Sequence, residues 1–216
     1  MTNSESRAPM TGIVLAGGQS TRFGADKASA VLAGRSMLEW VLSALAVVCE
    51  DLVVVTRPDQ DLPSLVQPLP FRVVEDVIPG QGPLAGLVYG LAVAAHGSCF
   101  AASCDMPLLQ PQLVTLLASL AGGYDVVCPR VGGFLQPLGA VYRRDRCIEA
   151  FERRVAEGRR KMSDAFHRLD VCVVEEQELR SADPGLDSFV NVNRPEALAA
   201  IERRLADAPE PGASVR

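Results

Sequence analysis

The hydrophobic positions along the chain follow two alternating patterns, short continuous apolar runs and longer segments with helical spacing. The run "TGIVLA" (Thr11–Ala16) is almost entirely apolar and ends at two glycines, which is typical of a strand buried on both faces of a parallel sheet. In residues 34–48, apolar side chains repeat at helical intervals, and Ser36 and Glu39 have the spacing of a capping box. A strand followed by a helix is the repeating unit of parallel α/β proteins.

The same alternation continues to about Arg130. Further strands are expected at 51–56, 71–76, 98–103 and 124–130, and further helices at 83–95 and 111–120. Pro83 is well placed to open its helix, and the small residues Gly86 and Gly90 would let that helix lie close to a sheet. The pattern predicts a three-layer α/β fold, with a mostly parallel, Rossmann-like sheet, right-handed crossovers and helices on both faces.

Beyond Pro129 the alternation breaks. Residues 134–144 are expected to contain a strand that runs in a different direction from its partners. Helices are expected at 146–158, 161–169 and 193–206, and a strand at 170–176. Asn193 fits the N-terminal cap of the last helix. The whole is interpreted as a single domain over residues 9–207, with flexible tails at 1–8 and 208–216.

Composition narrows the class of protein. Apolar residues make up 48% and charged residues 22%, which is ordinary for a globular protein, and the net charge of -5 argues against a general nucleic-acid binder. Six cysteines are scattered without a C-x-x-C pair, so they are interpreted as buried structural thiols. The N-terminus lacks a secretory signal and no run reaches the length of a membrane span, so a cytoplasmic location is expected.

The stretch "LAGGQSTRFGADK" (Leu15–Lys27) directly follows the first expected strand. In open α/β sheets, ligands bind at the carboxyl ends of the strands. Glycines let backbone N–H groups approach a phosphate closely, and Arg22 and Lys27 supply positive charge. The spacing matches neither the Walker loop nor the dinucleotide-binding pattern. The residues therefore predict a phosphate cradle of another kind.

This stretch resembles the signature L-A-G-G-x-S-x-R-M-G-x-D-K of nucleotidyltransferases of the molybdenum cofactor guanylyltransferase (MobA) family. Three more segments resemble family motifs in the right order: "VVEDVIPGQGPLAGL", "SCDMPLL" and "FVNVNRPEAL". The likeness runs from about Gly12 to Leu198. The chain departs from the pattern at Phe23, where methionine is usual, and at Arg57, where some members have asparagine. The segment around Gln136 matches only loosely.

The resemblance implies a fold of the nucleotide-diphospho-sugar transferase type and a specific reaction. GMP would pass from GTP to the terminal phosphate of molybdopterin, releasing pyrophosphate, with Mg²⁺ as cofactor. The attacking phosphate oxygen is already an anion, so no general base is required, and the two histidines lie outside every motif. The catalytic task would be electrostatic. Implied partners are GTP, molybdopterin, molybdoenzyme-specific chaperones and other cofactor-biosynthesis proteins, without nucleic acid or membrane.

The resemblance also assigns site residues. The implied GTP site consists of Leu15, Ala16, Gly17, Gly18, Lys27, Arg57, Asp76, Gly82 and Asp105. Arg22, Lys27 and Asp105 are the implied catalytic residues. The two cations would cover the triphosphate and Asp105 would hold Mg²⁺, a hard ion that prefers oxygen ligands. The implied molybdopterin site contains Asn191 and Asn193. Arg159 and Arg160, in the basic run at 158–161, are added as candidates for binding the molybdopterin phosphate.

Other interpretations of the same residues stay open. Related loops serve cytidylyl transfer to the same cofactor and nucleotidyl transfer to sugar or polyol phosphates, and a GTP-binding adaptor without activity is a third alternative. Asp105 and Asp76 are also compatible with plain turn or loop positions. Arg159 and Arg160 are equally compatible with a solvated helical face.

Overall fold

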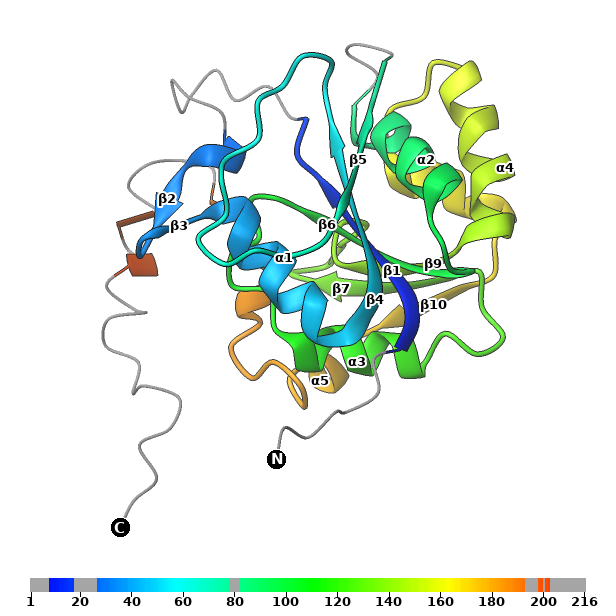
Figure 1. Cartoon of the computed structure of the whole chain (residues 1–216). Helices are drawn as coiled ribbons and strands as arrows, with labels where there is room; N and C mark the ends of the chain where they lie inside the picture. The colour runs from blue at the N-terminus through cyan, green and yellow to red at the C-terminus, as the bar shows by residue number, and fades with distance from the viewer. Residues whose placement is uncertain (1–7, 18–26, 78–81, 193–197, 200, 203–216) are drawn as a thin grey trace.

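The computed structural model describes residues 8–17, 27–77, 82–192, 198–199 and 201–202. Its centre is an eight-stranded sheet in the order β10-β7-β9-β6-β1-β4-β5, with β8 paired to β7 (Figure 1). The strands are β1 (Ala8–Leu15), β4 (Cys49–Thr56), β5 (Arg72–Glu75), β6 (Ser98–Ser103), β7 (Val126–Val131), β8 (Phe134–Leu135), β9 (Ala140–Arg143) and β10 (Val171–Val174). The predicted mostly parallel α/β sheet is confirmed.

The four strands in the middle and at one edge are parallel, and the break in the sequence pattern marks an antiparallel strand. β1 pairs in parallel with β4 and β6, and β4 with β5. β9 runs antiparallel to both β6 and β7. In the register, Leu15 lies beside Val55 on one side and Ser103 on the other, so the carboxyl ends of β1, β4 and β6 meet at one edge.

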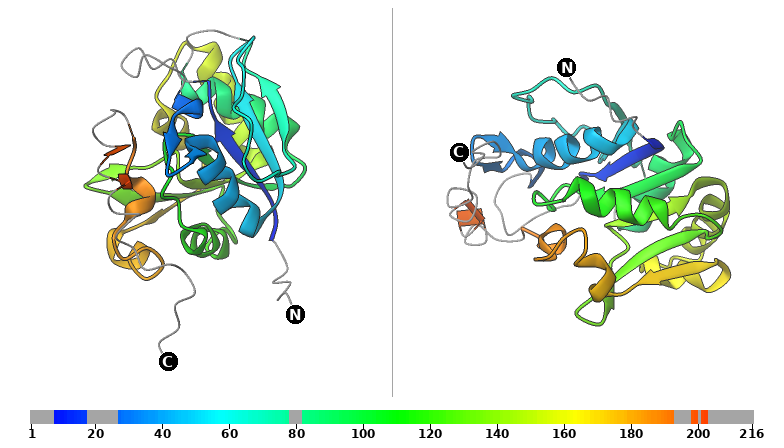
Figure 2. Two further views of the ribbon diagram at one scale, coloured as in Figure 1. Left: turned by 60° about the vertical axis from the view of Figure 1, so that its left-hand side comes forward. Right: turned by 90° about the horizontal axis from the view of Figure 1, so that it is seen from below.

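Helices cover both faces of the sheet, as predicted (Figures 1 and 2). α1 (Met37–Val48) and α3 (Pro111–Ser119) pack into one apolar core, and α2 (Pro83–Val93) and α4 (Arg144–Ala156) into the other. α2 lies so close to the sheet that a Cβ added at Gly90 would be 2.5 Å from Ile13 Cγ2. Glycine at this position is therefore a packing requirement.

The N-terminus of α1 shows half of the predicted capping box. Ser36 Oγ accepts a hydrogen bond from the Glu39 amide at 3.2 Å, as the spacing indicates. The buried Glu39 carboxylate instead accepts from the amides of Val66 and Gln67, at 2.8 and 3.0 Å. These amides belong to the 57–71 connection, which has no helix or strand of its own and needs other partners for its backbone.

The expected boundaries shift at several places. The first strand begins at Ala8, inside the expected N-terminal tail, and ends at Leu15. The expected helix at 161–169 is the 3-10 helix η2 (Met162–Arg168), and the strand expected at 170–176 ends at Val174 before α5 (Glu176–Leu179). Short elements that the periodicity did not predict are η1 (Lys27–Ser29), β2 (Val31–Leu32), β3 (Arg35–Ser36) and η3 (Asp187–Phe189).

Both chain ends lie largely outside the described residues. Residues 1–7 and 203–216 are not described. Most of the expected final helix at 193–206 also lies outside the described residues. Among the helices that the structure does describe, none is long and apolar enough to cross a membrane.

Candidate active site

Several residues of the predicted GTP site lie at or just beyond the carboxyl ends of the parallel strands. One backbone hydrogen bond beyond the ladders holds the segment after β1: the Ala16 N–H donates to the Val55 carbonyl at 2.8 Å. The Asp76 N–H likewise donates to the Thr56 carbonyl at 2.7 Å. The sheet thus fixes the first residues after β1 and β5, so side chains from different motifs share one edge.

Lys27 and Asp105 meet at this edge although 78 positions separate them. Lys27 Nζ donates to Asp105 Oδ2 at 3.1 Å, and the two side chains are 17% and 15% exposed. Lys27 opens η1, and Asp105 follows β6 by two positions. Both predicted catalytic residues within the described part of the chain therefore lie together, half-buried, with their charged ends in contact.

Gly17 lies against the segment that follows β4. A Cβ added at Gly17 would be 2.9 Å from the Arg57 amide nitrogen and 3.2 Å from the Thr56 carbonyl carbon. Because these are backbone atoms, no side chain can move aside to make room. The close approach requires glycine and brings Gly17 and Arg57, two predicted GTP-site residues, into direct contact.

Asp76 and Gly82 lie at the start of α2. An added Cβ at Gly86, in the first turn of α2, would be 3.7 Å from Asp76 Oδ2, so this carboxylate faces the helix start. Gly82 directly precedes the helix and lies beside the Arg160 backbone. A Cβ added at Gly82 would be 4.0 Å from the Arg160 carbonyl oxygen. The structure thus brings Arg160, predicted for the molybdopterin site, next to the predicted GTP site.

Asn191 lies on the other face of the sheet. It is exposed, and the next residue, Val192, is buried in a small cluster with Leu32 and Met37 near the start of α1. The Val192 amide donates to the Asp105 carbonyl at 2.9 Å. Arg160 follows α4, which packs on the opposite face, so the described molybdopterin candidates lie on two different sides of the sheet.

Two supporting residues carried no recognisable sequence signal. Gln60, in the 57–71 connection, bridges Ala16 and Arg57: its Nε2 donates to the Ala16 carbonyl at 3.1 Å, and its Oε1 accepts from the Arg57 amide at 3.1 Å. Asp183 is buried and accepts from the amides of Asp187 and Ser188, which shapes the turn that leads to Asn191. Neither residue belongs to a motif, because their role depends on contacts across the fold.

The chain matches a family described as the MobA-like NTP transferase domain over residues 12–173. It belongs to this family. A molybdenum cofactor guanylyltransferase from Desulfosudis oleivorans is 36% identical over 197 residues, covering 89% of this chain and 94% of the relative. A probable molybdenum cofactor guanylyltransferase from Pelotomaculum thermopropionicum is 36% identical over 188 residues, covering 87% and 89%.

Solved structures support the same MobA-like family. The molybdopterin-guanine dinucleotide biosynthesis protein A from Archaeoglobus fulgidus superposes with a TM-score of 0.76 at 27% identity, covering 92% of this chain and 100% of that one. The 2-C-methyl-D-erythritol 4-phosphate cytidylyltransferase from Thermus thermophilus gives a TM-score of 0.68 at 18% identity, covering 91% and 98%. The second likeness shows the fold alone, and together they confirm the nucleotide-diphospho-sugar transferase architecture.

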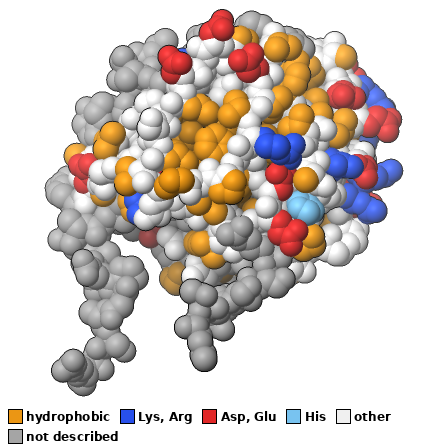
Figure 3. All heavy atoms as spheres, in the orientation of Figure 1, with side chains coloured by type: hydrophobic (Ala, Val, Ile, Leu, Met, Phe, Trp, Pro, Cys, Tyr) orange, Lys and Arg blue, Asp and Glu red, His pale blue; other side chains and the backbone are white. Residues whose placement is uncertain are grey.

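Three predicted residues of the MobA-like site, Gly18, Arg22 and Asn193, lie outside the described residues. Within α4, Arg153 pairs with Glu149 and Arg154 with Glu157 at the helix end, and charged side chains of both signs gather on this side of the molecule (Figure 3). Arg159 and Arg160 follow the helix and are exposed. The helix arginines therefore have a surface role, whereas the two later ones stay candidates.

The donor set at Asp105 suits Mg²⁺ in one respect and limits it in another. A carboxylate oxygen is the ligand that Mg²⁺ prefers, and Mg²⁺ in nucleotide sites is commonly held by one or two carboxylates plus phosphate oxygens and water. Within the described ranges, no group of three or more His, Cys, Asp or Glu side chains could form a metal cage. A magnesium ion here would therefore be held jointly by Asp105 and the nucleotide.

Most of the cysteines are buried, and His96 lies away from this edge of the sheet. Five cysteines are buried and Cys172 is half-buried. Burial raises the pKa of the Cys99, Cys128 and Cys147 thiols to about 12, so these thiols stay protonated and unreactive. His96 Nε2 lies 3.5 Å from Glu50 Oε2, near the amino ends of β4 and β6 and so at the opposite edge of the sheet. The interpretation of the buried cysteines as structural residues agrees with these environments.

Proposed function

We propose that the protein transfers GMP from GTP to the terminal phosphate of molybdopterin, forming the guanine dinucleotide and releasing pyrophosphate. The observation that carries the proposal is the Lys27–Asp105 contact of 3.1 Å, which joins two family motifs at the carboxyl edge of the sheet. A cation and a metal-binding carboxylate at one point are what a triphosphate requires. The names of the relatives in the MobA-like family support the choice of substrates.

The proposed reaction is a single displacement. A phosphate oxygen of molybdopterin attacks the α-phosphorus of GTP, and the bond from that phosphorus to the bridging oxygen of pyrophosphate breaks. The attacking oxygen is already ionised, so no side chain has to remove a proton. Lys27 and Arg22 would reduce the repulsion between the two anions and stabilise the charge that develops on pyrophosphate. Mg²⁺, held by Asp105 and phosphate oxygens, would supply further positive charge when bound.

The edge offers distinct places for the parts of the substrates. We place the nucleoside along Leu15–Gly18, Arg57, Asp76 and Gly82, which the structure gathers around the ends of β1, β4 and β5 and the start of α2 as far as it describes them. Asn191 and Asn193 are proposed for the acceptor side. Arg159 and Arg160 are proposed for the acceptor phosphate, which would have to reach across the edge, since Arg160 and Asn191 lie on opposite faces.

The decisive experiment is incubation with GTP, Mg²⁺ and molybdopterin, followed by mass analysis for the guanine dinucleotide. A competition among GTP, CTP, ATP and UTP tests the base. Preference for CTP would replace guanylyl with cytidylyl transfer, and GTP binding without pyrophosphate release would favour an adaptor. Omission of Mg²⁺ should abolish the reaction.

The cellular setting follows from the proposed reaction. We propose that the protein acts in the cytoplasm and passes its product to chaperones or enzymes that use the finished cofactor. A pull-down with product-loaded protein would test this, and recovery of unrelated proteins alone would contradict it.

A further inference from the structure

The Gln60 side chain spans the junction between two segments of the proposed nucleotide site. Its amide donates to the Ala16 carbonyl after β1 and accepts from the Arg57 amide after β4, each at 3.1 Å. The side chain is partly buried, and the residues it joins are 44 and 3 positions away. A single side-chain amide thus uses both its donor and its acceptor to hold two strand ends together.

The peptide that Gln60 holds is the one that carries the Gly17 N–H. A peptide unit is planar, and in the trans form its C=O and N–H point in opposite directions. The structure contains no cis peptide bond among its described residues. The hydrogen bond that directs the Ala16 carbonyl toward Gln60 therefore also sets the direction of the Gly17 N–H.

The preceding peptide is held by the sheet, so the peptide between Ala16 and Gly17 is the one whose orientation can still change. The Ala16 N–H is fixed by the Val55 carbonyl at 2.8 Å, and the Leu15 carbonyl accepts from the Cys104 amide at 3.1 Å. The sheet therefore already holds the preceding peptide. Gly17 has no side chain to restrict its own backbone, so rotation of the 16–17 peptide is opposed mainly by its packing on Arg57 and by Gln60.

We infer that Gln60 is a positioning residue that aims the Gly17 N–H and the Arg57 backbone at the nucleotide and so sets how tightly, and with which preference, the base is held. The inference rests on the proposed function, because it takes the nucleotide to lie along the strand ends. Gln60 acts through Gly17 and Arg57, and it should affect nucleotide binding much more than the rate of GMP transfer.

The sharpest variant is Gln60→Glu. A carboxylate still accepts from the Arg57 amide, but it cannot donate to the Ala16 carbonyl and repels that oxygen. We expect Kd for Mg²⁺-GTP to rise about fivefold to tenfold, the size of one misdirected hydrogen bond, with kcat changed less than about twofold. The preference for GTP over CTP should fall by a similar factor. Gln177→Glu, on the exposed surface of α5, adds the same charge and should change none of these.

Binding is measured by titration calorimetry, which needs no acceptor, and turnover is measured separately with molybdopterin. A melting temperature that drops while both Kd and base preference match the wild type would overturn the inference and leave Gln60 a structural residue. If Gln60→Glu does not fold, Gln60→Ala, which adds no charge, is judged by the same measurements.

Failure of the proposed GMP transfer and failure of the proposed role of Gln60 give different experimental results. A wild-type protein that binds GTP without transferring GMP contradicts the proposed reaction, and the Gln60 variants are still judged on binding. A wild type that prefers CTP contradicts the choice of base, and the variants are then judged on CTP. A wild type that binds no nucleotide overturns both the proposed function and the role of Gln60.

Discussion

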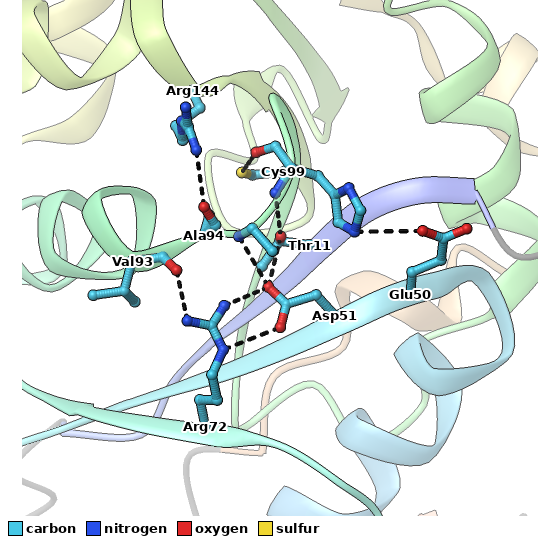
Figure 4. A network of polar contacts seen from close by, with 10 residues as sticks. Thr11, Glu50, Asp51, Arg72, Val93, Ala94, Cys99 and Arg144 are labelled. Atoms are coloured by element: carbon cyan, nitrogen blue, oxygen red, sulfur yellow. Dashed lines mark hydrogen bonds and ion pairs between the residues drawn. The ribbon is translucent and has the colours of Figure 1, made fainter.

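The two ends of the central parallel strands each carry an acidic and a basic side chain in contact, and the two pairs differ in how they are held. At the amino ends, Asp51 accepts hydrogen bonds from Arg72 Nη2 at 2.6 Å and Nε at 3.2 Å, from Thr11 Oγ1 at 2.9 Å and from the Ala95 amide at 3.1 Å (Figure 4). At the carboxyl ends, Asp105 Oδ2 accepts from Lys27 Nζ at 3.1 Å.

The Asp51–Arg72 pair holds elements of the fold together, whereas the Asp105–Lys27 pair belongs to the candidate active site. Arg72 also donates to the Val93 carbonyl at 2.8 Å, so one planar guanidinium ties β4, β5 and the end of α2 together. An arginine fork on a carboxylate is a geometric lock, whereas a lysine ammonium is a mobile point charge. The amino edge is therefore built to hold the fold, and we expect the Lys27 ammonium at the carboxyl edge to turn to an incoming phosphate.

The largest expected contrast comes from Asp105→Asn. Loss of the charge that we propose holds Mg²⁺ should reduce kcat for pyrophosphate release by about a thousandfold or more. The melting temperature should change by no more than about 4 °C, because a partly exposed ion pair contributes little stability. Asp61→Asn, at an exposed position, is the control. Near-normal turnover in Asp105→Asn would remove Asp105 from the catalytic set.

Gly17→Ala tests the close approach at the carboxyl edge. The added methyl group would meet the Arg57 backbone nitrogen at 2.9 Å, so the strand ends must separate. We expect kcat/KM for GTP to fall about tenfold to a hundredfold. Gly97→Ala is the matched change at the amino edge, where an added Cβ has no neighbour within 4 Å among the described residues, and it should leave kcat/KM unchanged. Equal effects of the two substitutions would contradict the comparison.

Asp51→Asn should lower the stability of the fold and leave turnover nearly unchanged, the reverse of what we expect for Asp105→Asn. Weaker hydrogen bonds to Arg72, Thr11 and Ala95 should lower the free energy of unfolding by about 1–2 kcal/mol, measured by urea denaturation. The kcat of the folded protein should stay within about twofold of the wild type. Asp145→Asn, whose side chain is 74% exposed, should change stability by less than about 0.5 kcal/mol. A large loss of kcat in Asp51→Asn would show that the amino edge also serves catalysis.

The smallest expected effect is a dependence of stability on pH. Burial alone would raise the pKa of Asp51, but hydrogen bonds from Arg72, Ala95 and Thr11 outweigh burial and hold the pKa below its usual value. The folded protein therefore favours the ionised form, and the resulting stabilisation is present near neutral pH and is lost as the pH falls below about 4. The difference in unfolding free energy between wild type and Asp51→Asn should narrow over that range. A difference that is constant from pH 7 to pH 3 would show that ionisation of Asp51 does not contribute.

The sequence predicted the layers, the parallel core and the edge of the sheet at which the candidate site residues meet. Continuous apolar runs alternating with helical periods indicate buried parallel strands joined by crossover helices. Because the strands are parallel, their carboxyl ends all lie at the same edge of the sheet. The position of Lys27 and Asp105 at a common edge follows from that geometry. The antiparallel β9 was also predicted, from the break in the alternation after Pro129.

Contacts between distant side chains were decided by the tertiary structure alone. The hydrophobic period does not show that the Glu39 carboxylate binds the amides of the 57–71 connection. It does not show that Gln60 joins Ala16 to Arg57. It also does not show that Arg160 and Asn191 lie on opposite faces of the sheet. Periodicity records which face of one element is buried, and that is a local property. A hydrogen bond across 44 positions depends on distances that exist only once the whole sheet has formed.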